Sequence, residues 1–160
     1  MRYVIKRRYL RGAEVRFLAE NGELTYRARE PFIGFTQDLT NAAGETVLAI
    51  RKLPLSLRKD FEVLRDGKVI ATITKKTGMR LWYRVEMGGE TAISIRPNYW
   101  ATKFDFINSE GRIAVLSEPM LLQFFKPTEL TIFDERQEEI VVAATVAVLN
   151  APPTSDDNRL

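Results

Sequence analysis

The 160-residue sequence predicts a mainly β fold, a closed antiparallel barrel of about twelve strands around a central hydrophobic C-terminal helix. Three observations predict it: glycines recurring about every 22 residues, alternating apolar and polar residues after each glycine, and an uninterrupted apolar segment near the carboxyl end. The length suits one domain of ordinary size. We therefore expect a single barrel domain over residues 1–150, followed by a flexible polar tail over 151–160.

The repeat is marked by glycines that follow a small or polar residue, separated by 22, 23, 22 and 22 positions: Gly22, Gly44, Gly67, Gly89 and Gly111. Asn-Gly, Asp-Gly and Gly-Gly pairs favour tight hairpin turns, because both central residues of such turns need positive φ. Even spacing by chance in an all-β chain is the alternative reading. The sequence around the glycines recurs as well, however, in NGELTYRAR, AGETVLAIR and DGKVIATIT, which favours a true repeat.

Each period contains two strand-like runs, one before its glycine and one after it. The runs alternate in hydrophobicity with period two, as half-buried strands do. Together with an opening run over residues 3–9 and a late run over 130–134, they give about twelve strands. A unit repeated at this length indicates one supersecondary element stacked many times.

The segment over residues 137–150 breaks the pattern. It contains no Gly or Pro and is apolar on every side from Ile140 onward. Acidic residues precede it, where a helix N-terminus favours negative charge, and Asn150 with two prolines forms a stop signal. We predict a helix over about 137–150, with a final buried strand as the competing interpretation.

A helix that is apolar all round must be buried all round. A closed sheet of about twelve strands is too wide for its own side chains to fill. A helix on the barrel axis would therefore fill the interior and at the same time be buried on every side. Ala143, Ala144 and Ala147 keep that helix slender. Burying its larger side chains at roughly 1.5–3 kcal/mol each would make it the core of the domain.

Composition excludes several classes of function. The chain has no cysteine and no histidine, which removes disulfides, thiolate metal sites and His-based catalysis. Neighbouring carboxylates such as Glu138 with Glu139 are better explained as helix-start charges than as a catalytic pair. We expect no enzyme activity, cofactor or metal. The longest apolar run is too short to cross a bilayer, and the opening residues lack a signal-peptide core, so we expect a cytoplasmic protein.

Basic residues form the candidate site. The net charge is only +3, so we do not expect nucleic-acid binding. The positive charges are nevertheless clustered, first over residues 2–11, then around 51–59 and then over 75–84. Because both pairs lie seven to nine residues past a turn glycine, Arg51 and Lys52 are expected near one rim with Lys75 and Lys76. The candidate anion-binding residues are Arg51, Lys52, Lys75, Lys76, Arg80 and Arg84. The competing reading treats them as ordinary solvated strand faces.

Two apolar features of the sequence allow more than one interpretation. Aromatic residues near strand ends, among them Phe35, Trp100, Phe104 and Phe106, are expected mostly to pack against the helix. The segment Pro119–Pro127 holds five apolar residues between two prolines. We expect it to cover one end of the barrel, with a surface wedge for a membrane or a protein partner as the alternative.

The sequence resembles the tubby C-terminal-like barrels, and within them the LURP-one-related branch, which is distantly similar to the phospholipid scramblases. The resemblance rests on MRYVIKRRYL with VRFLAENGELTYRARE, on DGKVIATITKKTGMRLWYRVEM and on IVVAATVAVLNA. It implies a twelve-stranded barrel around a central helix. Because tubby domains bind phosphoinositide headgroups, it also implies a role at anionic lipids.

The sequence thus favours a non-enzymatic binding or scaffold domain that contacts anionic lipid headgroups through a basic rim, peripheral to a membrane. The alternative is a protein–protein interaction module with no lipid role.

Overall fold

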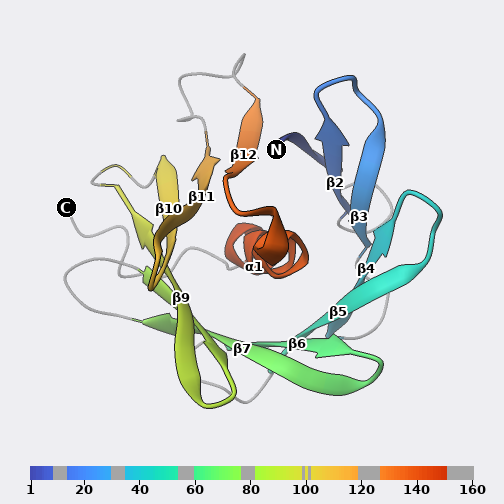
Figure 1. Ribbon diagram of the computed structural model, residues 1–160. Coiled ribbons are helices and arrows are strands. Elements are labelled where there is room, and N and C mark those ends of the chain that lie inside the picture. The colour runs from blue at the N-terminus through green and yellow to red at the C-terminus, as the bar shows by residue number, and fades with distance from the viewer. Residues whose placement is uncertain are drawn as a thin grey trace.

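The computed structural model describes residues 1–8, 14–29, 35–53, 60–76, 82–98, 100, 102–118 and 127–150. Twelve strands form a closed antiparallel barrel in which each strand pairs with its sequence neighbours and β12 pairs with β1 (Figure 1). The strands are β1 (Arg2–Arg8), β2 (Glu14–Ala19), β3 (Leu24–Arg29), β4 (Thr36–Asn41), β5 (Thr46–Lys52), β6 (Phe61–Arg65), β7 (Lys68–Lys76), β8 (Trp82–Met87), β9 (Glu90–Pro97), β10 (Lys103–Asn108), β11 (Gly111–Ser117) and β12 (Thr128–Ile132). The predicted closed barrel is confirmed.

The strands follow the alternation of the sequence. In β5, Leu48 and Ile50 are buried while their neighbours Val47, Ala49 and Arg51 are partly exposed. Successive side chains of a strand point to opposite faces of the sheet, so the apolar set lines the barrel and the polar set faces solvent. Closure leaves no sheet edge to pair with another chain.

The five glycine hairpins gather at one end of the barrel, which we call the turn rim. Each of these hairpins has a register shift close to its turn. Both turn residues have positive φ only at Asp66–Gly67 and Gly88–Gly89 within the described chain. At Gly22, Gly44 and Gly111 glycine alone has positive φ, so these turns differ from the predicted type, in which both central residues have positive φ.

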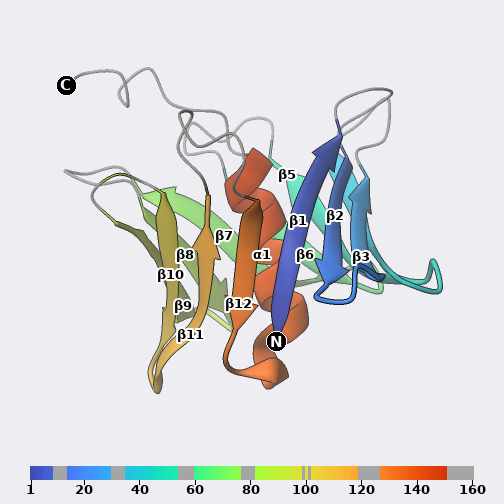
Figure 2. The ribbon, with the colours of Figure 1, turned by 90° about the horizontal axis from the view of Figure 1, so that it is seen from above.

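The other end, which we call the distal rim, lies where β1, β3, β5, β7, β9 and β11 finish and where their partner strands begin. Figure 2 shows the barrel from the side, with the hairpins at one end and the carboxyl end of the helix toward the other.

Helix α1 (Glu138–Asn150) runs along the barrel axis, preceded by a short 3-10 turn η1 (Glu135–Gln137). Asp134 caps this turn, because its side chain accepts a hydrogen bond from the Arg136 N–H. Every residue from Ile140 to Val148 is buried. The predicted helix is confirmed and the competing strand is wrong. Its burial differs from the prediction at one residue, because Leu149, near the distal end of the helix, is only partly buried.

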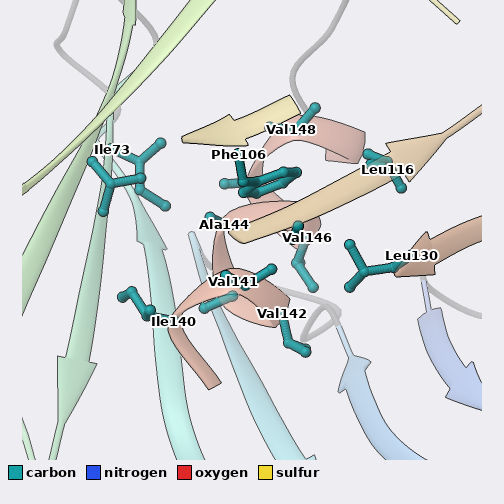
Figure 3. Close-up of a cluster of buried hydrophobic side chains, with 14 of the residues drawn as sticks. Ile73, Phe106, Leu116, Leu130, Ile140, Val141, Val142, Ala144, Val146 and Val148 are labelled. Carbon is teal, nitrogen blue, oxygen red and sulfur yellow. The ribbon is translucent and has the colours of Figure 1, made fainter. Parts of the chain in front are cut away.

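The buried side chains of the helix and those of the strands form one hydrophobic core. In Figure 3, Val146 points toward Leu130 of β12, and Phe106 and Ile73 approach the helix from β10 and β7. Thr145, the one polar residue of the buried stretch, donates its hydroxyl hydrogen to the Val141 carbonyl at 2.8 Å, so it places no unpaired polar group in the core. Near the distal rim, the Asn150 side-chain amide donates to Gln37 Oε1 at 2.7 Å.

Candidate functional site

Charge is separated along the barrel axis. The described residues include equal numbers of basic and acidic side chains, but the two kinds gather at opposite ends. Within three strand residues of the distal rim lie thirteen basic residues: Lys6, Arg7, Arg8, Arg16, Arg27, Arg29, Arg51, Lys52, Lys75, Lys76, Arg84, Arg96 and Lys103. Seven acidic residues share that half: Glu14, Asp38, Asp60, Glu62, Asp105, Glu118 and Glu129.

The turn rim has the opposite balance. Its five basic residues are Arg2, Arg65, Lys68, Arg112 and Arg136. Its eleven acidic residues are Glu20, Glu23, Glu45, Asp66, Glu86, Glu90, Glu110, Asp134, Glu135, Glu138 and Glu139. The distal half therefore has six more basic than acidic residues and the turn half six more acidic than basic. This separation gives the barrel a positive and a negative end.

The distal rim contains five of the six candidate site residues, and Arg80 lies outside the described residues. Their side chains divide between the two faces of the wall. By strand alternation Lys52 and Lys75 share the inner face with Ile50 and Ile73, whereas Arg51, Lys76 and Arg84 lie on the outer face. The shared offset from the turn glycines correctly predicts one rim, but the residues do not form one continuous outer patch.

Several of these cations are already engaged. Arg51 Nε donates to Glu62 Oε2 at 2.8 Å, and Glu62 is its register partner on β6. Arg84 pairs with Glu86 at 3.3 Å, and its guanidinium lies 5.3 Å from the centre of the Trp82 ring. Lys75 is almost completely buried, with 3 % of its surface exposed. Lys52 and Lys76 are half-exposed, and neither side chain has an ion pair with any residue that the structure describes.

Two exposed aromatic side chains stand at the same rim. Phe35 is 60 % exposed just before β4, and its carbonyl accepts a hydrogen bond from the Lys52 N–H at 2.8 Å. Trp100 is 66 % exposed between β9 and β10. Phe104 and Phe106 are buried as expected, but the expectation of packing is wrong for Phe35 and Trp100. Pro119–Pro127, whose role was left open, lies outside the described residues except for its last residue.

A carboxylate organises the outer arginines of β2 and β3. Glu14 Oε1 lies 2.9 Å from both Arg16 Nε and Arg27 Nε. Burial raises the pKa of Glu14, but the hydrogen bond and charge of Arg16 and the charges of Arg27 and Arg29 outweigh it and hold the pKa below its usual range. Sequence analysis missed Arg27 and Arg29. Arg29 lies at the same offset from Gly22 as Arg51 from Gly44, which could have found it, and Arg27 lies two residues earlier on the same strand face.

The turn rim has its own ionic network around η1. Arg136 bonds to both Asp134 and Glu110, and these bonds raise the pKa of its guanidinium while the bond to Arg136 lowers that of Asp134. Tyr3 donates to Glu138 at the start of α1, and burial followed by that carboxylate raises the tyrosine pKa. These contacts fix the amino end of the helix and leave the excess negative charge of that rim in place.

The described residues contain no cluster of three or more acidic, His or Cys side chains that could hold a metal ion. None of their helices has both the length and the apolar character needed to cross a membrane.

The fold therefore defines the class: a single-domain β-barrel with a hydrophobic helix on its axis and a surface divided into a basic and an acidic end. A family model described as LURP-one-related matches residues 1–149, and the chain belongs to the LURP-one-related family. No curated protein matches it in sequence. The fold is similar to that of an X-ray structure of a protein from Arabidopsis thaliana, with a TM-score of 0.67 and 15 % identity, covering 99 % of this chain and 92 % of that one.

Proposed function

We propose that this protein is a non-enzymatic binding domain of the cytoplasm whose distal rim docks on anionic phospholipid headgroups, phosphoinositides among them. The observation that carries the proposal is the axial separation of charge: among the described residues, thirteen basic ones lie at the distal rim and eleven acidic ones at the turn rim. A net charge of +3 alone would not predict an anionic partner. The separation does, because an anionic surface attracts one end of the barrel and repels the other.

Because electrostatic forces have a short range in salt, this separation of charge orients the barrel on an anionic surface. Charges interact over about a Debye length, roughly 8 Å at physiological salt, which is shorter than the strands that separate the two rims. A membrane surface at the distal rim is therefore affected by the basic end and little by the acidic end. Each Lys or Arg close to such a surface contributes about 1 kcal/mol of attraction.

Within the rim, Lys52 and Lys76 are the cations best placed to meet headgroups, because no ion pair with a described residue occupies them. The exposed rings of Phe35 and Trp100 add a second kind of contact. Aromatic side chains suit the boundary between headgroups and acyl chains, because the ring can contact the acyl chains while the polar groups around it stay hydrated. Cations and exposed aromatics at one rim are the combination that a peripheral membrane contact needs.

Co-sedimentation with phospholipid vesicles tests the proposal. The full chain is expected to bind vesicles that contain phosphatidylserine or a phosphoinositide, to ignore pure phosphatidylcholine vesicles, and to be released by salt. Absence of binding to anionic vesicles at low salt would contradict the proposal.

Strand β7 offers a matched pair of variants, because Lys76 ends it at the distal rim and Lys68 begins it at the turn rim. Lys76→Gln should weaken vesicle binding about fivefold, the effect of one charge worth about 1 kcal/mol, whereas Lys68→Gln should leave it unchanged. Equal effects of the two changes would mean that the rim does not orient the barrel.

A further inference from the structure

A hollow of about 330 Å³ lies on the outer wall of the barrel, along β3 and β4. Its lining residues come from both strands and from the turn that follows β4: Arg27, Arg29, Thr36, Asp38, Thr40 and Gly44. The volume falls at the lower end of the range for small-molecule sites, which is about 300–1,000 Å³. The lining side chains include two guanidinium groups, one carboxylate and two hydroxyls.

The strand register explains why the wall is hollow at this place. Asp38 of β4 has Arg29 as its partner on β3 and Ala49 as its partner on β5. The small alanine leaves no bulky neighbour on the β5 side of Asp38. On the β3 side, alternation directs Arg27 and Arg29 outward together, because Tyr26 and Ala28 face the core.

Arg29 and Asp38 are opposite charges at paired positions, yet they do not form an ion pair. Neither side chain has an ion pair or a hydrogen bond within the described part of the chain, although the Arg29 charge acts on nearby Glu14. By contrast, Arg51 and Glu62 hold equivalent paired positions on β5 and β6 and do bond to each other. The Arg29 and Asp38 groups are therefore both available to a third molecule.

Two further groups complete the lining. The Nε atom of Arg27 lies 2.9 Å from Glu14 Oε1, an ion pair that keeps the side chain beside the hollow. The Thr40 hydroxyl donates to the Arg27 carbonyl at 3.3 Å, so its oxygen lone pairs remain as acceptors. The site thus offers fixed positive charge on the β3 side and oxygen acceptors on the β4 side.

We propose that this hollow binds a soluble phosphorylated sugar or polyol. The phosphate group contacts Arg27 and Arg29, whose planar donors match phosphate oxygens, and hydroxyl groups of the ligand donate to Asp38 and Thr40. Two guanidiniums favour a dianionic phosphate over a singly charged carboxylate. Asp38 repels a bare anion, so the ligand must present hydroxyl donors on that side.

The hollow begins at the distal rim, to which Arg27, Arg29 and Asp38 belong, and extends along the outer wall to Gly44 at the turn rim. Its ligand is a soluble molecule, whereas the partner proposed for the rim as a whole is a membrane surface. The inference does not rest on lipid binding, and either can fail without the other.

Isothermal titration calorimetry of the full chain with glucose 6-phosphate, glucose and inorganic phosphate tests the proposal. Glucose 6-phosphate is expected to bind more tightly than inorganic phosphate, and glucose is expected not to bind. Equal affinity for the two phosphate compounds, or binding of neither, would overturn the proposal.

Two variants separate the roles of the charges. Arg29→Gln should weaken glucose 6-phosphate binding about tenfold or more, because it removes charge-assisted hydrogen bonds. Asp38→Asn should strengthen inorganic phosphate binding and reduce the advantage of the sugar phosphate, because it removes the repulsion and weakens the hydroxyl acceptor. Both residues are exposed, so the fold should tolerate the changes, which circular dichroism checks.

The matched control is Arg96→Gln. Arg96 on β9 faces Asp105 on β10 in the same kind of paired position, and Asp105 is bonded instead to Arg112 at 3.4 Å. This change should leave glucose 6-phosphate binding unaltered. A loss equal to that of Arg29→Gln would show general attraction to a basic surface and would overturn the assignment of the hollow.

Discussion

Val146 offers the sharpest test of the barrel's core. It is fully buried in the middle of α1 and points toward Leu130. Val146→Ala removes two methyl groups, at about 0.8 kcal/mol each in lost burial. It also leaves a cavity of about 50 Å³, which costs roughly a further 1.2 kcal/mol. The better helix propensity of alanine returns about 0.5 kcal/mol.

The net loss in the free energy of unfolding is about 2 kcal/mol, which lowers the melting temperature of a domain of this size by about 5–8 °C. Urea unfolding followed by circular dichroism and tryptophan fluorescence measures it. The control is Val69→Ala in β7, where the side chain is 47 % exposed and the expected loss is below about 0.5 kcal/mol. Equal losses at the two positions would refute the enclosed helix.

Three further changes probe the helix, a turn and the surface charges. Ala144→Leu should destabilise the fold by about 1–3 kcal/mol in urea, because a fully buried alanine leaves no room for a larger side chain. Gly44→Ala should cost about 1–2 kcal/mol in the same assay purely through its backbone, since its φ is +83° and nothing lies within 4 Å of the added methyl group. Glu14→Gln should reduce acid sensitivity: the lowered pKa of Glu14 means that its stabilising contribution is present at neutral pH and is lost as pH falls through the folded-state pKa, below its unfolded value of about 4.3. The free energy of unfolding should therefore fall less between about pH 6 and about pH 3 in the variant than in the parent, and an equal fall would contradict this role.

The sequence predicts the architecture well because the glycine repeat and the apolar segment that interrupts it are both local patterns. The glycines and the alternation of 24–29 or 46–52 specify hairpins, and the run from Ile140 to Leu149 departs from that alternation. A helix apolar on every side has no stable place other than an interior. The turn types at Gly22 and Gly44 were not predictable, because the bulges that accommodate them depend on the pairing of both strands.

The candidate site is predicted only in part. Shared offset from a glycine places Arg51 and Lys76 at one rim, since strands of the same direction end together. It does not say that Glu62 engages Arg51 while Lys76 has no ion pair with a described residue, because those facts depend on neighbours in the barrel rather than in the chain. The unpaired Arg29 and Asp38 depend on register in the same way.

Hydrogen exchange of the α1 backbone amides, followed by NMR, tests most directly whether the helix fills the barrel and confines binding to the outer surface and rims. The amides of Val142 through Val148 should exchange only through global unfolding, with the slowest rates in the protein and the same free energy as urea unfolding. Exchange of these amides at a lower free energy than the strands around them would show that the helix leaves the barrel without unfolding it, and would contradict the account.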